Sequence, residues 1–208
     1  MSAPDKSIDL RLLSAAREAF LSKGYELASL SEICRAAGVT TGAFYKRYDG
    51  KEQLFSALVA DTIRDMERYM ENIEAADLSA YTDEMLYNGF FMRPKDNLSW
   101  LRFLYERREG FALLIKCAAG TRYANFHQDW AERMNRLSYR FYQEAYARGM
   151  TTKVFSTEEM QVFTSAIWAL CYEPFIHGGF SWEQLERHAT LINQFINWHE
   201  VLGIARPN

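Results

Sequence analysis

Residues 11–55 read RLLSAAREAFLSKGYELASLSEICRAAGVTTGAFYKRYDGKEQLF. In the first segment of this stretch, from Leu12 to Phe20, apolar residues recur three and four positions apart, which predicts a helix with one buried face. Gly24 and Gly38 each supply the left-handed position at which such helices end. The stretch therefore predicts short helices joined by tight turns, the pattern of a helix-turn-helix unit.

The second and third helices of this stretch carry their own start signals. Ser29 and Glu32 stand at the spacing of a capping box and predict that the second helix begins there. Thr40 is placed to cap a third helix that runs to about Tyr48. Phe44 and Tyr48 are four residues apart, so we expect both to face inward.

The outward face of the third helix carries small residues, a tyrosine and two cationic residues. With Phe44 and Tyr48 turned inward, that face consists of Thr41, Ala43, Tyr45, Lys46 and Arg47. A helix that lies in the major groove needs small residues and hydrogen-bonding or cationic ones of this kind. A purely structural alternative stays open, because caps and a solvated lysine-arginine pair also occur in proteins that never meet DNA.

A fourth helix is expected after Asp49, which forms a second capping-box pair with Glu52. Lys51 lies in its first turn, where free backbone N–H groups also favour a phosphate. The whole chain has a formal charge of -3. Between residues 35 and 51, however, four cations (Arg35, Lys46, Arg47 and Lys51) face one anion, Asp49, which is a local balance of +3. The charge pattern therefore favours a local DNA site rather than a nonspecific DNA coat.

With the motif AAGVTTGAFY at residues 36–45, the first quarter of the chain resembles the DNA-binding domain of the tetracycline repressor family of bacterial transcription regulators. The resemblance implies that residues 41–48 are the recognition helix, with Thr41, Gly42 and Ala43 near base edges and Tyr45 and Arg47 on phosphates. It also implies a phosphate contact for Lys51. Lys46 and Arg47 depart from the aromatic residue and histidine that the family often has there, and both add positive charge. The complete predicted DNA-binding set is Ser29, Thr40, Thr41, Gly42, Ala43, Tyr45, Lys46, Arg47 and Lys51.

Beyond this stretch the chain reads as all-α. It has 208 residues, 49% hydrophobic content, four prolines and little strand-like alternation. We expect a DNA-binding domain at residues 1–52 and a helical ligand-binding and dimerisation domain at residues 53–208, joined by one continuous helix from about Lys51 to Glu74. Further helices are expected over residues 79–92, 97–108, 109–119 and 122–148.

The localisation expected from the sequence is cytoplasmic. The N-terminal residues MSAPDKSIDLRLL lack the apolar core of a signal peptide, and no apolar run approaches the length of a membrane span. Cys34, Cys117 and Cys171 are odd in number and widely spaced, which fits free thiols in a reducing compartment.

The last two expected helices, at about residues 156–178 and 181–202, are the most apolar. Ser156 with Glu159, and Ser181 with Gln184, predict their capping boxes. Their apolar surface exceeds one face, and the family resemblance implies its cover: two helices from each subunit in a four-helix dimer interface. A twofold dimer would present two recognition helices to a palindromic operator. A large monomeric core is the alternative.

Aromatic residues concentrate after residue 52, and two interpretations stay open. Aromatic side chains on helices usually pack against one another as core. The family resemblance instead implies an effector cavity among the middle helices, with walls that methionines such as Met85, Met92 and Met134 make adaptable. The predicted ligand-binding set is Tyr87, Phe91, Trp100, Phe103, Tyr105, Phe111, Phe126 and Trp130. Such a cavity would favour a small apolar or aromatic effector.

These patterns predict a ligand-responsive DNA-binding transcription regulator, a homodimeric repressor released from a palindromic operator by its effector. One alternative is a helical protein that binds or sequesters small molecules and whose DNA-binding domain is vestigial. A second is an all-α enzyme with a substrate pocket that the sequence does not reveal. We expect no enzymatic activity and no cofactor, because Cys117 has no evident histidine partner in the sequence. His188 and His199 are eleven residues apart, too far along a helix to share one metal ion.

Overall fold

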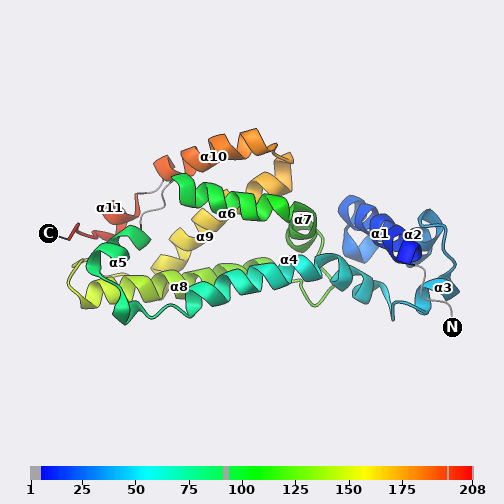
Figure 1. Cartoon of the computed structure of the whole chain (residues 1–208), viewed down its shortest axis with the longest axis horizontal. Helices are drawn as coiled ribbons and strands as arrows, with labels where there is room; N and C mark the ends of the chain where they lie inside the picture. Colours follow the sequence, from blue (N-terminus) through cyan, green and yellow to red (C-terminus); the bar gives the residue numbers. More distant parts are fainter. Residues whose placement is uncertain (1–5, 91–93, 196, 208) are drawn as a thin grey trace. The chain divides into compact units, whose positions relative to one another are not determined.

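The computed structural model describes residues 6–90, 94–195 and 197–207. Within these ranges every regular element is a helix, so the predicted all-α class is confirmed (Figure 1). The chain divides into two compact units, which we call unit 1 (residues 1–67 and 107–127) and unit 2 (residues 68–106 and 128–208).

Unit 1 contains α1 (Lys6–Leu27), α2 (Leu30–Ala36), α3 (Thr41–Tyr45), the first part of α4 (Lys51–Glu74) and α7 (Arg108–Lys116). A core cluster of this unit includes Leu12, Phe20, Phe44 and Phe55, all with 0% exposure. Residues of α7 and its C-terminal end, such as Leu113 and Cys117, belong to the same cluster. The helix α3, predicted from the sequence, therefore packs in a core to which α7, a segment far along the chain, also contributes.

The helix signals of unit 1 are partly confirmed. Gly24 interrupts α1 with φ 77°, and α4 has the predicted bounds. The capping box predicted for Ser29 is wrong, because the Ser29 side chain makes no cap hydrogen bond and Glu32 pairs instead with Lys23 at 2.7 Å. That pairing lowers the pKa of Glu32.

The box predicted for Asp49 and Glu52 is also wrong. The Asp49 N–H donates to Gln53 Oε1 at 2.5 Å, while a Glu52 carboxylate oxygen accepts from the Arg122 N–H at 2.9 Å. In both cases the glutamate of the predicted box pairs instead with a group that folding brings near it.

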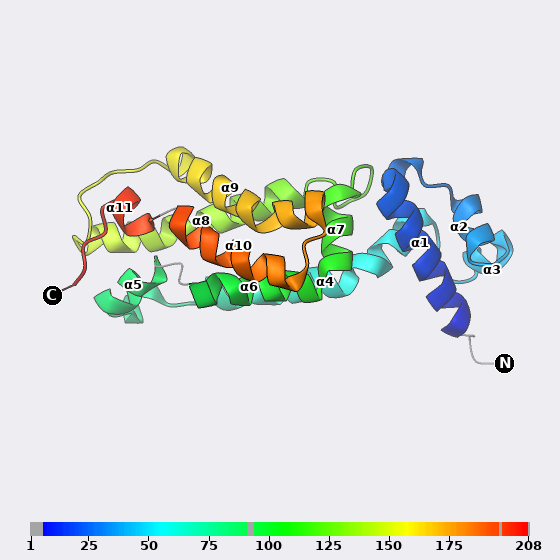
Figure 2. The same ribbon diagram turned by 90° about the horizontal axis from the view of Figure 1, so that it is seen from above.

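Unit 2 contains the rest of α4, a short 3₁₀ turn (Leu78–Ala80), α5 (Asp83–Gly89), α6 (Pro94–Glu106), α8 (Phe126–Ala147) from residue 128 onward, and α9 (Thr157–Glu173). A π-helical turn (Pro174–Gly178), α10 (Trp182–Phe195) and α11 (Trp198–Leu202) complete it. α10 packs against α6 (Figure 2). Leu101 of α6 and Leu185, Ala189 and Ile192 of α10 are buried together in one cluster.

Two predicted caps of unit 2 are confirmed and one predicted helix is divided. Ser156 with Glu159 forms the reciprocal capping box of α9, and Ser181 exchanges hydrogen bonds with Gln184 at the start of α10. The helix expected over residues 181–202 is wrong as a single element. Asn197 instead caps a separate α11 by accepting a hydrogen bond from the Glu200 N–H.

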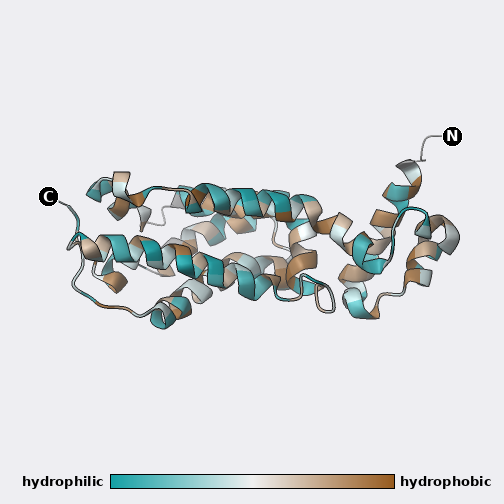
Figure 3. Cartoon of the chain, turned by 90° about the horizontal axis from the view of Figure 1, so that it is seen from below, coloured by the Kyte–Doolittle hydropathy of each residue, from teal (hydrophilic) through white to brown (hydrophobic). Residues whose placement is uncertain are grey.

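Most helices of both units show hydrophilic and hydrophobic residues on different faces (Figure 3). No helix in the described ranges combines the length and apolar character needed to cross a membrane.

Candidate DNA interface and ligand cavity

The surface of α3 is built by one buried side chain and one cap. Phe44 is fully buried and its ring stacks on Tyr48 at a centroid distance of 5.6 Å. Thr40 Oγ1 accepts a hydrogen bond from the Ala43 N–H at 3.2 Å, which fixes the first turn. The helix ends at Tyr45, three residues earlier than predicted.

Five of the predicted DNA-binding residues are exposed on or beside α3. Thr41, Gly42 and Lys46 are exposed, and Tyr45 is 59% exposed, with its ring edge against Phe44 at 5.2 Å. Thr40 is also exposed, whereas Ala43 and Ser29 are half-buried. The structure thus brings small, aromatic and cationic groups together on one short helix, which is the combination that a groove-reading helix requires.

The other two predicted cations, Arg47 and Lys51, make internal contacts. Arg47 Nε lies 3.1 Å from Asp9 Oδ1, and its side chain is only 17% exposed. Lys51 Nζ donates to the carbonyl oxygens of Tyr25 at 2.6 Å and Ala28 at 3.0 Å.

The Lys51 ammonium also reaches the Glu26 carbonyl at 3.2 Å and lies 4.3 Å from the centroid of the Tyr25 ring. It therefore satisfies the carbonyls that the end of α1 leaves open. This role was not visible in the sequence, because its partners lie 23 to 26 residues earlier in the chain.

Ion pairs, a backbone hydrogen bond and a close packing contact join α7 to the rest of unit 1. Arg17 pairs with Glu109, Arg107 Nε lies 2.9 Å from Asp65 Oδ2, and the Tyr25 N–H donates to the Cys117 carbonyl at 3.2 Å. At Gly110 the contact with α4 is so close that an added Cβ would lie 2.2 Å from Thr62 Oγ1. These contacts make α7 a structural part of unit 1.

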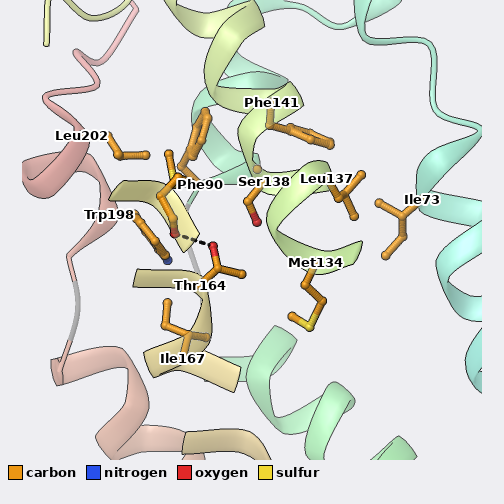
Figure 4. Close-up of a pocket in the computed structure, with 12 residues that line it drawn as sticks. Ile73, Phe90, Met134, Leu137, Ser138, Phe141, Thr164, Ile167, Trp198 and Leu202 are labelled. Atoms are coloured by element: carbon orange, nitrogen blue, oxygen red, sulfur yellow. Dashed lines mark hydrogen bonds between the residues drawn. The ribbon is translucent and has the colours of Figure 1, made fainter. Parts of the chain in front are cut away.

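Unit 2 holds two adjoining cavities. The smaller, of about 240 Å³, is lined by apolar residues that include Phe90, Phe141, Met160, Trp198 and Leu202 (Figure 4). The larger, of about 370 Å³, is lined by Tyr69, Asn97, Trp100, Trp130 and Cys171 among others. Both cavities share Ile73, Gly89, Met134, Leu137, Ser138 and Ile167.

Of the predicted ligand-binding residues, Trp100 and Trp130 line the larger cavity, with nearly parallel rings whose centroids are 6.4 Å apart. Phe103 stacks on Trp100 at 5.3 Å. Tyr87 stacks on His199 at 4.0 Å, and Tyr105 packs against Trp182.

The remaining predicted residues lie elsewhere. Phe126 packs against the core cluster of unit 1 and Phe111 is buried on α7, while Phe91 lies outside the described residues, as does Met92. Met134 lines both cavities, as a methionine wall would. Sequence reasoning missed Asn97, because a single asparagine in a helical stretch carries no pattern of its own.

Metal binding finds no support in the described ranges, where no group of three or more His, Cys, Asp or Glu side chains could hold an ion. The three cysteines are buried free thiols. Burial raises the pKa of each of them, that of Cys171 to about 12, so the thiols stay protonated near neutral pH.

Comparison with known proteins agrees with this geometry. Residues 12–58 match the model of a family described as bacterial regulatory proteins, tetR family. The HTH-type transcriptional regulator UidR of Escherichia coli K12 is 34% identical over 77 residues, which is 36% of this chain and 39% of that protein. The match thus spans about two-fifths of the relative's length.

Solved structures extend the likeness of fold to nearly the whole chain. A TetR-like transcriptional regulator from Rhodococcus sp. RHA1 is 14% identical with a TM-score of 0.58, over 97% of this chain and 100% of that one. A member of the TetR transcriptional regulator family from Streptomyces coelicolor is 16% identical with a TM-score of 0.58, over 100% of this chain and 94% of that one.

Proposed function

We propose that this chain, whose residues 12–58 form the N-terminal domain of the tetR family of bacterial regulatory proteins, is a DNA-binding transcription regulator that acts in the cytoplasm. The observation that carries the proposal is the surface of α3. Thr41, Gly42, Tyr45 and Lys46 are exposed there on a helix that the buried Phe44 and the Thr40 cap hold in place. Small residues would approach base edges, while Tyr45 and Lys46 would contact phosphates.

The regulator acts as a homodimer in this proposal, with α9 and α10 of each subunit at the interface. Support comes from large apolar side chains that these helices leave exposed: Val162 at 68%, Leu191 at 58% and Phe195 at 69%. A twofold dimer presents two α3 helices to a palindromic operator. Sedimentation of the wild type beside Phe195→Lys tests this step, and a wild-type monomer at micromolar concentration would contradict it.

An effector in the cavities of unit 2 completes the proposal, and it releases the repressor from its operator. A ligand shifts the DNA-binding equilibrium only as far as it prefers the DNA-free state. Equal affinity of an effector for DNA-free and DNA-bound protein would contradict this step.

The deciding experiment is selection of bound duplexes from a random pool at about 150 mM salt, because affinity for DNA depends strongly on salt. The wild type is compared with Lys46→Ala and Tyr45→Ala, and with Lys116→Ala as a cation of α7 outside the α3 surface. We expect one palindromic sequence from the wild type and Lys116→Ala, and weakened enrichment from the α3 variants. Thr41→Ala should change the preferred sequence.

No enriched sequence from the wild type, or equal enrichment from all variants, would contradict DNA reading by α3. Tight binding of small molecules without any operator preference would favour the alternative, a sequestering protein with a vestigial DNA-binding domain.

A further inference from the structure

In the larger cavity of unit 2, as far as the structure describes it, the buried side-chain amide of Asn97 lacks a hydrogen-bond partner for its nitrogen. Asn97 lies in the first turn and a half of α6, lines the cavity and is 4% exposed. Among the described residues, its Nδ2 atom has no acceptor. An unmade hydrogen bond at a buried amide costs about 1–3 kcal/mol, so this group favours the arrival of an acceptor.

The walls beside Asn97 are flat and aromatic. Trp100 follows one turn later on α6, and its ring lies within 7° of parallel to that of Trp130. The Tyr69 ring lies 4.7 Å from that of Trp100. Parallel rings and a thioether wall at Met134 favour a planar, polarisable ligand over a branched aliphatic one.

The charge of the lining excludes anions. Asp96 is the one ionisable carboxylate among the described lining residues, and none of these is Lys, Arg or His. A carboxylate ligand would therefore enter a desolvated site without a counter-charge and beside a like charge. Asp96 itself is exposed, so water screens its charge and a cation gains little from it, and the lining favours an uncharged compound.

We propose that the larger cavity binds an uncharged planar aromatic compound whose carbonyl oxygen accepts a hydrogen bond from Asn97 Nδ2. Its rings lie against Trp100 and Trp130, and the adjoining smaller cavity accommodates an apolar substituent. The regulatory meaning of this site rests on the proposed function, whereas the binding itself does not require DNA.

The test uses the full chain without DNA and three matched probes in isothermal titration. These are 2-acetylnaphthalene, 2-isopropenylnaphthalene, in which a CH₂ group replaces the carbonyl oxygen, and the anion 2-naphthoate. We expect the ketone to bind the wild type about tenfold more tightly than the alkene, the effect of one hydrogen bond to a buried donor. The anion should bind more weakly than the ketone.

Asn97→Leu replaces the amide with an apolar group of similar size and should reduce the ketone-to-alkene ratio to about one, with the alkene bound at least as tightly as by the wild type. Asn97→Ala, which removes the N–H donor without adding another donor, should also lose the preference for the ketone. Circular dichroism checks that both variants are folded. If Asn97→Leu does not fold, the other Asn97 variant provides the test.

Equal affinity of the wild type for ketone and alkene, binding of neither, or a ratio that survives both substitutions would overturn the proposal. Preference for the ketone that leaves operator affinity unchanged would support the site and contradict only its role as an effector site. Failure of the duplex selection would likewise leave the binding result standing, so the two proposals fail separately.

Discussion

The two units differ in how their interiors are filled and in how their polar side chains are bonded. In unit 1, residues of α7 share a core cluster with α1, α2, α3 and α4, and the Lys51 and Arg47 side chains bind the unit's own carbonyls and Asp9. Unit 2 divides its core and leaves two cavities, one with an unsatisfied amide. Empty space and unmade hydrogen bonds both cost stability. Two adjoining cavities with largely apolar linings indicate that unit 2 keeps room for a ligand, whereas unit 1 holds the surface of α3 through Phe44 and the Thr40 cap.

The largest expected effect tests this difference in packing by replacing one glycine with alanine in each unit, which adds one methyl group. In unit 1, Gly110→Ala places a Cβ at 2.2 Å from Thr62 Oγ1 on α4, so the helices must move apart. We expect a loss of about 2 kcal/mol in the free energy of unfolding, as overpacking a tight core typically costs. Chemical denaturation measures it.

The matched control is Gly89→Ala, at a site that lines both cavities of unit 2. Its Cβ would lie 3.4 Å from Phe141, an ordinary contact, so stability should change by less than about 0.5 kcal/mol. Thr62→Ala should partly rescue Gly110→Ala in a double-mutant cycle. Equal losses at the two glycines would refute the contrast in packing.

The next effect separates two lysines five residues apart. Lys51→Met removes the ammonium that reaches the Tyr25, Glu26 and Ala28 carbonyls, and we expect it to lower the free energy of unfolding by about 2 kcal/mol, the value of charged hydrogen bonds. Lys46→Met alters an exposed side chain and should leave stability unchanged. It should instead lower operator affinity. The slope of log affinity against log salt concentration should decrease in magnitude by about 0.9, the value for one lost phosphate contact.

Equal stability of the two methionine variants would show that Lys51 does not hold the end of α1. A full salt-slope effect for Lys51→Met without loss of stability would restore the phosphate contact implied for it by family resemblance.

The sequence predicted what depends on neighbours in the chain. The break at Gly24, the Thr40 cap and the Ser156 box were read correctly, because each signal and its partner lie within a few residues. The Ser29 box failed although its spacing was correct, since Lys23 offered Glu32 a competing charge.

What the sequence could not predict depends on tertiary contacts. The approach of Gly110 to Thr62 joins positions 48 residues apart, and the Asn97 amide is unusual only because of what surrounds it. Trp100 and Trp130 were predicted as part of a large aromatic set, but composition alone could not separate them from Phe111, which is buried on α7 and lines neither cavity.

A smaller effect, the pH dependence of stability, tests whether water reaches Cys171 in the wall of the larger cavity. Burial raises the pKa of Cys171 to about 12, partly offset by the neighbouring Trp100 side chain. Because the folded-state pKa lies above that of an unfolded thiol, near 8.5, the unfolded chain loses its proton first. Stability therefore decreases as pH rises above about 8.5, by at most about 1.4 kcal/mol per pH unit from this group.

The measurement is the free energy of unfolding of the wild type and Cys171→Ala at several pH values between about 8 and 10.5, where this linkage operates. The raised pKa of Tyr172 affects both proteins alike. The pKa of Tyr69 is raised chiefly by burial and least by the charge of Cys171, so the difference in slope reports mainly on the thiol. Identical slopes would mean that water reaches Cys171 and that the wall is wetter than its burial indicates.

The smallest change to the fold gives the most direct test of α3. An added Cβ at Gly42 meets no atom within 4 Å in the free protein, and alanine is the better helix former. Gly42→Ala should therefore raise the free energy of unfolding, by at most about 1 kcal/mol. If Gly42 lies close to base edges, the same methyl group enters a tight contact and lowers operator affinity on the order of tenfold, or about 1.4 kcal/mol. A gain in stability joined to a loss of DNA affinity can arise only where the bound partner, and not the fold, requires the glycine. Unchanged affinity would place the base contacts away from the first turn of α3.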